Sequence, residues 1–119
     1  MNFPSRYLAV GAAVNNTQYV EVPASYRLVG ATVTQEGASV TAHAANYKIL
    51  TLKDSSGNTI ATANTVAGWV KGAVTAFTMS GPEYAVLTAG QRFEIDASHA
   101  GTGAAIDCSI TLELAAARG

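Results

Sequence analysis

The sequence predicts an all-β fold, an antiparallel β-sandwich of about eight strands. Apolar residues recur at every second position along much of the chain, which is the repeat of a strand with one buried face. The alternating segments are short, and turn-forming residues separate them at the spacing typical of a sandwich or barrel. The predicted strands span residues 7–14, 18–22, 26–35, 47–53, 59–64, 74–79, 91–97 and 106–114.

The N-terminal segment allows two interpretations. Residues 1–16 form an arm or an edge strand, and residues 17–119 form the jelly-roll domain described below. Residues 7–14 either make a strand or lie extended across a neighbouring surface, and the strand at 18–22 ends at Pro23. Because residues 7–19 carry no charge, we expect this stretch to reach out and order against a neighbouring molecule.

The middle of the chain predicts one long strand and one hairpin. Residues 26–35 are rich in aromatic and β-branched side chains, which favour strands. Residues 47–53 and 59–64 pair as a hairpin, because the segment between them is dense in turn formers. A further strand at 74–79 precedes the break at Gly81 and Pro82. The alanine-rich stretch at 42–45 is expected to be a loop rather than a helical turn.

The last two predicted strands have the clearest alternation. A helix would spread the apolar residues of 106–114 around its circumference, whereas a strand places them on one face. The side chains expected to be buried are Phe93, Ile95, Ile106, Cys108, Ile110 and Leu112. Gly101 and Gly103 permit a bent loop over residues 98–103. Residues 115–117 either end the last strand, form a loose tail or make a helical turn.

Composition narrows the classes of function. With 119 residues, 49% hydrophobic, and a net charge of −1, the chain predicts one folded domain and no basic surface for nucleic acid. No apolar run of about 18 residues and no leader pattern occur, so we expect a soluble protein made in a cytoplasm, without a membrane span. Charged residues are 13%, against roughly 25% on average. Either a partner covers part of the surface, or the sandwich has a threonine-rich solvent face.

The histidines and acids predict no catalytic or metal site. His43 and His99 lack a second ligand at metal-binding spacing, and Asp96 three residues before His99 is a weak signal. We interpret both histidines as surface loop residues and expect alanine at His43, His99 or Asp96 to leave function intact. Glu94 and Asp96 share one strand face, which indicates a solvated polar stripe rather than an acid/base pair.

The other candidates also favour structural roles. Cys108 has no disulfide partner in the chain and lies on an inward face, so a buried thiol is expected rather than a nucleophile. Gly101, Thr102 and Gly103 resemble half of a phosphate loop but precede a strand instead of a helix. Trp69 is expected to pack in the core or at an edge, the alternative being an exposed partner-binding or sugar-stacking residue. No catalytic, cofactor-binding or metal residue is assigned.

Three pieces of the chain occur in a familiar order: the hairpin at 47–61, the Leu-Thr-Ala-Gly-Gln-Arg-Phe-Glu-Ile run at 87–95, and the ending at 101–113. Together they make residues 26–114 resemble the small jelly-roll cement, or decoration, proteins on the heads of tailed bacteriophages. The resemblance implies a jelly roll, a homotrimer, and attachment to the major capsid protein on the outer surface of the capsid. It implies no cofactor and no catalysis, and it transfers no residue roles.

Three hypotheses of function follow. A capsid cement protein fits the low charge and the lack of an active-site pattern. The alternative is a carbohydrate-binding jelly-roll module, or a fibre-like or lectin-like domain, in which Trp69, Tyr84 and Tyr47 stack on sugars. An enzyme on a cupin-like barrel needs a His/Glu metal cluster, which the sequence does not contain. We favour the first hypothesis.

Overall fold

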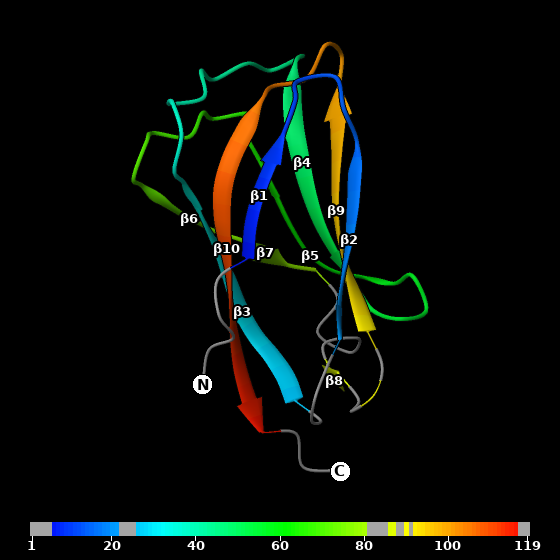
Figure 1. Ribbon diagram of the computed structural model, residues 1–119. Helices are drawn as coiled ribbons and strands as arrows, with labels where there is room; N and C mark the ends of the chain where they lie inside the picture. The colour runs from blue at the N-terminus through cyan, green and yellow to red at the C-terminus, as the bar shows by residue number, and fades with distance from the viewer. Residues whose placement is uncertain (1–5, 22–25, 81–85, 88–89, 91, 117–119) are drawn as a thin grey trace.

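The computed structural model describes residues 6–21, 26–80, 86–87, 90 and 92–116 (Figure 1). These residues form ten strands and no helix, so none of them belongs to a helix long and apolar enough to cross a membrane. In chain order the strands are β1 (Arg6–Val10), β2 (Asn16–Glu21), β3 (Tyr26–Gln35), β4 (Tyr47–Lys53), β5 (Thr59–Asn64), β6 (Val74–Ala76), β7 (Thr78–Met79), β8 (Val86–Leu87), β9 (Arg92–Ala100) and β10 (Ile106–Ala116).

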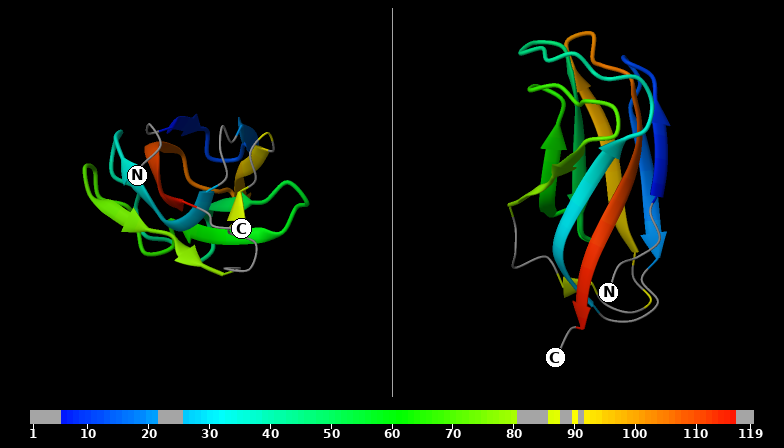
Figure 2. Two further views of the ribbon diagram at one scale, coloured as in Figure 1. Left: turned by 90° about the horizontal axis from the view of Figure 1, so that it is seen from below. Right: turned by 90° about the vertical axis from the view of Figure 1, so that its left-hand side faces the viewer.

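The strands form two antiparallel sheets that pack face to face (Figures 1 and 2). Sheet A has the order β1-β10-β3-β6, with β8 also paired to β3, and sheet B has the order β2-β9-β4-β5-β7. When the two-residue strands β7 and β8 are left out, the other strands can be renumbered in chain order, so that β9 becomes strand 7 and β10 becomes strand 8. The sheets then have the orders 1-8-3-6 and 2-7-4-5. This is the double Greek key of a jelly roll, so the predicted fold is confirmed.

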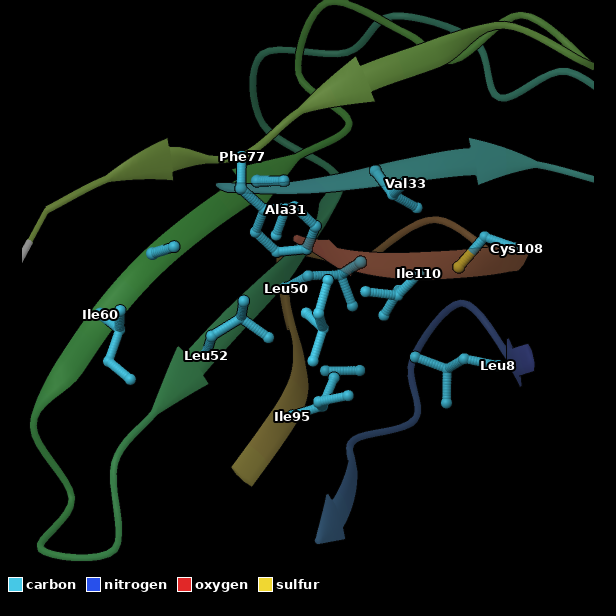
Figure 3. Close-up of a cluster of buried hydrophobic side chains, with 14 of the residues drawn as sticks. Leu8, Ala31, Val33, Leu50, Leu52, Ile60, Phe77, Ile95, Cys108 and Ile110 are labelled. Atoms are coloured by element: carbon cyan, nitrogen blue, oxygen red, sulfur yellow. The ribbon is translucent and has the colours of Figure 1, made fainter. Parts of the chain in front are cut away.

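The core lies between the sheets, where inward side chains of both layers point toward one another (Figure 3). The residues predicted to be buried are all at most 3% exposed: Phe93, Ile95, Ile106, Cys108, Ile110 and Leu112. Leu50 and Leu52 of β4 contribute from sheet B, and Leu8 of β1 contributes from sheet A. Burial of each side chain of this size stabilises the fold by about 1.5–3 kcal/mol. Because this gain favours burying the apolar face of every strand, the apolar residues at alternate positions predicted the core correctly.

The segment at residues 74–79 is two strands in different sheets, not the single strand that we predicted. β6 pairs with β3 in sheet A, whereas β7 pairs with β5 in sheet B. Phe77 lies between them, is buried, and donates its N–H to the carbonyl of Ala31 at 2.8 Å. The backbone therefore crosses from one layer to the other at Phe77, and the buried ring anchors the crossing.

For residues 6–10 and 16–21 the strand alternative is right, because they belong to the sandwich and do not form an arm. β1 pairs with β10 at the edge of sheet A, and β2 pairs with β9 at the edge of sheet B. Leu8, Val10 and Val20 point into the core, so hydrophobic burial holds this stretch within the sandwich. Residues 1–5 of the predicted arm lie outside the described residues.

The ends of several strands differ from the prediction. β9 continues to Ala100 and takes over part of the predicted loop, so the connection to β10 is limited to residues 101–105. β10 includes Ala115 and Ala116, so the helical-turn alternative is wrong for these two residues and the strand alternative is right. The short strand β8 was not predicted. Residues 42–45 form a loop, as expected.

Candidate functional site

The outer face of sheet B carries charged side chains of both signs. Its outward charged residues, termed the charged face, are Glu21, Lys53, Arg92, Glu94 and Asp96. Lys53 Nζ lies 3.1 Å from Asp96 Oδ2, and the guanidinium carbon of Arg92 lies 4.1 Å from the centre of the Tyr19 ring. The predicted polar stripe of Glu94 and Asp96 is therefore present, and Asp96 pairs with Lys53 rather than with His99.

The outer face of sheet A has no charged side chain across its centre. Its outward residues there, termed the neutral face, are Tyr7, Val29, Gly30, Thr32, Thr34, Val74, Ala76, Ser109 and Thr111. Tyr7 and Val74 are 60% and 63% exposed, and Val29, the extra residue of a bulge in β3, is 46% exposed. The outward charged residues of sheet A adjoin this surface: Arg27, Asp107 beside Ser109 on β10, and Glu113 opposite Gly30. An exposed, uncharged and partly apolar surface has the composition of an interface core.

A buried lysine organises one end of the sandwich. Lys48 is fully buried, and its Nζ donates to the carbonyls of Gly11, Ala12 and Val14 at 2.7, 3.1 and 2.7 Å. Its backbone N–H donates to the Oγ1 of Thr65, which is also buried. Burial lowers the pKa of Lys48, because the interior disfavours the charged ammonium. Lys48 therefore clamps the β1–β2 loop onto β4 at the end drawn in the upper part of Figure 1.

Sequence analysis missed the role of Lys48, although a signal for it exists. Lys48, Leu50 and Leu52 occupy alternate positions of β4, and all three point into the sandwich. A lysine on the apolar face of a predicted strand must have its ammonium satisfied by buried acceptors. The position of Lys48 thus indicated a structural lysine. Its acceptors could not be identified from the sequence, because they lie more than 30 residues away in the chain.

Both histidines fasten loops at the same end. His43 Nδ1 accepts the backbone N–H groups of Ala45 and Asn46 at 3.1 and 2.9 Å. The side-chain oxygen of Asn46 in turn accepts the N–H of Thr102 at 2.9 Å, which joins the β3–β4 loop to the β9–β10 loop. His99 Nδ1 lies 2.7 Å from Asn15 Oδ1, within hydrogen-bond distance. His43 is a loop residue, as predicted, whereas His99 belongs to β9, so the loop interpretation is wrong for His99. Each histidine has a specific hydrogen-bond partner.

A shallow recess of about 390 Å³ opens between these loops. Its described lining residues carry no carboxylate, ammonium or guanidinium: Ser39, Val40, Thr41, His43, Asn46, Thr102, Gly103, Ala104 and Ala105. In the described part of the chain, no three His, Cys, Asp or Glu side chains are arranged to hold a metal. The recess offers hydroxyl and amide groups but no tyrosine or tryptophan against which a ligand ring could stack.

The remaining predicted residues do not form a common site. Trp69 is 3% exposed and pairs through its backbone with Val40, so the core interpretation is confirmed and the exposed-stacking alternative is wrong. Tyr47 is half-buried at the start of β4, and Tyr84 lies outside the described residues. Residues 101–103 form a turn between two strands, as their position before a strand predicted.

Cys108 is expected to be inert in the folded protein. The thiol is completely buried, and its burial, with a smaller contribution from the charge of Asp107, raises its pKa from 9.0 to about 12. A disulfide reagent at about pH 8 should label it only after unfolding, because the thiolate is the reactive form. Because the folded pKa exceeds the unfolded one, this group should leave stability unchanged below pH 9 and reduce it as the pH rises toward 12. Labelling of native protein as fast as of urea-unfolded protein would contradict this expectation.

Lys48→Met is expected to lower the free energy of unfolding by about 2 kcal/mol, because three carbonyls lose a charged donor. The matched control is Lys53→Met, which removes only the partly exposed ion pair with Asp96 and should cost less than about 1 kcal/mol. Urea denaturation of both variants at neutral pH measures the difference. Equal losses in the two variants would show that the clamp contributes nothing specific.

Neither a protein-family model nor a curated protein sequence matches this chain. Its function is therefore inferred from the residues and geometry of its two faces and its loops.

Proposed function

We propose that this protein is a structural cement, or decoration, protein that binds the outer surface of a tailed-bacteriophage head and stabilises contacts between major capsid proteins. The observation that carries the proposal is the neutral face. Its centre is free of charge across β1, β10, β3 and β6, and it exposes the side chains of Tyr7, Val29 and Val74. Covering the centre of this surface, around Thr32, Thr34, Ser109 and Thr111, removes apolar area from water and buries no charged side chain of that centre. The resemblance of residues 26–114 to phage cement proteins supplies the identity of the partner.

The proposed mechanism is mechanical rather than chemical. A protein that spans the boundary between capsomers adds contacts that must be broken before the capsomers separate. One neutral face is small, so a single copy binds weakly. A homotrimer engages three faces at once, and the second and third contacts then form at high effective concentration. Threefold and quasi-threefold positions of a shell present three equivalent surfaces, which suits a closed cyclic trimer.

The carbohydrate-binding alternative is weakened, because Trp69, its first candidate for stacking on a sugar, is buried. The stacking role was assigned first to Trp69, whose ring is buried beneath the surface. Tyr47 is half-buried and stands at the start of β4, away from the neutral face on the opposite sheet. No nucleic acid, membrane, cofactor or catalytic step forms part of the proposed function.

Deletion of the gene tests the proposal. We expect heads to assemble, to lose one small protein, and to become more sensitive to heat and to chelators. Wild-type heads should contain about one copy per major capsid protein, because each capsid subunit meets one threefold position. Adding the purified protein back should restore resistance, and light scattering should show it to be a trimer. Mutant heads with an unchanged protein composition and unchanged resistance would refute the proposed function.

A further inference from the structure

A second recess lies on the charged face, on the opposite side of the sandwich from the neutral face. It is open to solvent, has a volume of about 520 Å³ and is lined, among the described residues, by Tyr19, Glu21, Ser55, Gly90 and Arg92. β2 and β9 supply its wall, and the β4–β5 turn, drawn in green at the lower right of Figure 1, supplies Ser55. Its volume falls within the range of about 300–1,000 Å³ that is usual for small-ligand sites.

The polar groups of this recess are unusually arranged. Glu21 and Arg92 stand directly opposite each other in the register of β2 and β9. The Arg92 guanidinium nevertheless lies over the ring of Tyr19, at 4.1 Å from its centre. Among the described residues, the one ion pair is Lys53–Asp96, and Glu21 takes no part in it. The Glu21 carboxylate and the edge of the Arg92 guanidinium therefore both remain available for hydrogen bonds to a ligand, beside Tyr19, a residue that is 47% exposed.

These groups define the chemistry of the ligand. The adjacent charges of Glu21 and Arg92 offset each other, so the recess favours neither an anion nor a cation. Carboxylate oxygens accept hydrogen bonds from hydroxyl groups, and guanidinium N–H groups donate to them. The exposed part of the Tyr19 ring offers an apolar surface for the C–H face of a sugar. We propose that this recess binds a neutral sugar residue of a glycan.

The site differs from the one considered in the sequence, since it contains none of Trp69, Tyr84 and Tyr47. It also lies on the sheet that faces away from the neutral face, so occupation of one surface leaves the other open. Glycan binding here does not depend on capsid attachment, so the isolated 119-residue chain is sufficient to test it.

Nuclear magnetic resonance titration of the 119-residue chain tests the proposal. The probes are neutral hexoses and N-acetylhexosamines, with a hexuronate and a sialic acid as anionic comparisons. We expect saturable shifts of amides in β2, the start of β9 and the β4–β5 turn with at least one neutral sugar. Tyr19→Ala and Arg92→Met should each weaken binding by about tenfold or more, through the loss of the ring surface or of charged donors.

The matched control is Tyr7→Ala, which removes an exposed tyrosine from the opposite sheet and should leave sugar affinity unchanged. The wild-type titration does not depend on how the variants fold. The proposal would be overturned by the lack of saturable shifts with every neutral sugar, by a preference for the anionic sugars, or by unchanged affinity in Tyr19→Ala.

Discussion

Thr32→Lys is expected to weaken attachment of the protein to phage heads by about a hundredfold or more. Thr32 lies at the centre of the neutral face, where the register of sheet A places it between Thr111 and Ala76. When that face is covered by the shell, the ammonium of a lysine at this position would lose its hydration. Burial of an unpaired ammonium costs several kcal/mol, far more than the loss of one threonine contact.

The matched control is Thr62→Lys. Thr62 is also half-buried and central in its sheet, between Thr51 and Thr78, but it faces outward from sheet B. Sedimentation of each purified variant with heads that lack the protein measures attachment, and circular dichroism with thermal melting verifies the fold. Thr62→Lys should bind like the unmodified protein. Normal binding by Thr32→Lys, or an equal loss in both variants, would exclude the neutral face as the contact surface.

Gly103→Ala is expected to destabilise the fold by more than about 3 kcal/mol. The residue has a left-handed backbone with a φ of 71°, which an L side chain adopts only at a cost. A methyl group there would also overlap the carbonyl oxygen of Ala12. That carbonyl accepts a hydrogen bond from the buried Lys48 ammonium, so it cannot move aside without weakening the clamp on the β1–β2 loop.

Gly57→Ala separates the two causes. Gly57 has a φ of 88°, and a side chain at this position would meet no atom within 4 Å. Its replacement should therefore cost only the backbone strain of about 1–2 kcal/mol. Chemical denaturation of both variants gives the comparison. Equal losses would show that close packing of the β9–β10 loop against the β1–β2 loop does not limit stability.

The strand pattern of this protein could be predicted because it is local. The alternation of Phe93 and Ile95, and of Ile106, Cys108 and Ile110, decides which side chains are buried without reference to the rest of the chain. The same logic failed at residues 74–79, where Phe77 keeps to the apolar pattern while the backbone passes from sheet A to sheet B. A change of sheet leaves no mark in a period-two repeat.

The candidate sites were less predictable, because they depend on residues that are distant in sequence. Lys48 looked like one more scattered cation, since its three carbonyl acceptors belong to a loop more than 30 residues earlier. The recess on the charged face brings Tyr19 and Glu21 of β2 against Arg92 of β9. Their proximity follows from the pairing of these two strands, which no local pattern specifies.

The sequence by itself determined the all-β class, the inward face of most strands and the low charge of the whole surface. It did so because side-chain alternation and composition act residue by residue. The tertiary structure alone decided which outward residues share a face. Tyr7, Thr34 and Ser109 become neighbours because β10 lies between β1 and β3, and Glu21 meets Arg92 because β2 pairs with β9. Sheet order is set by the joint burial of both inner faces, so the neutral face exists only in the folded protein.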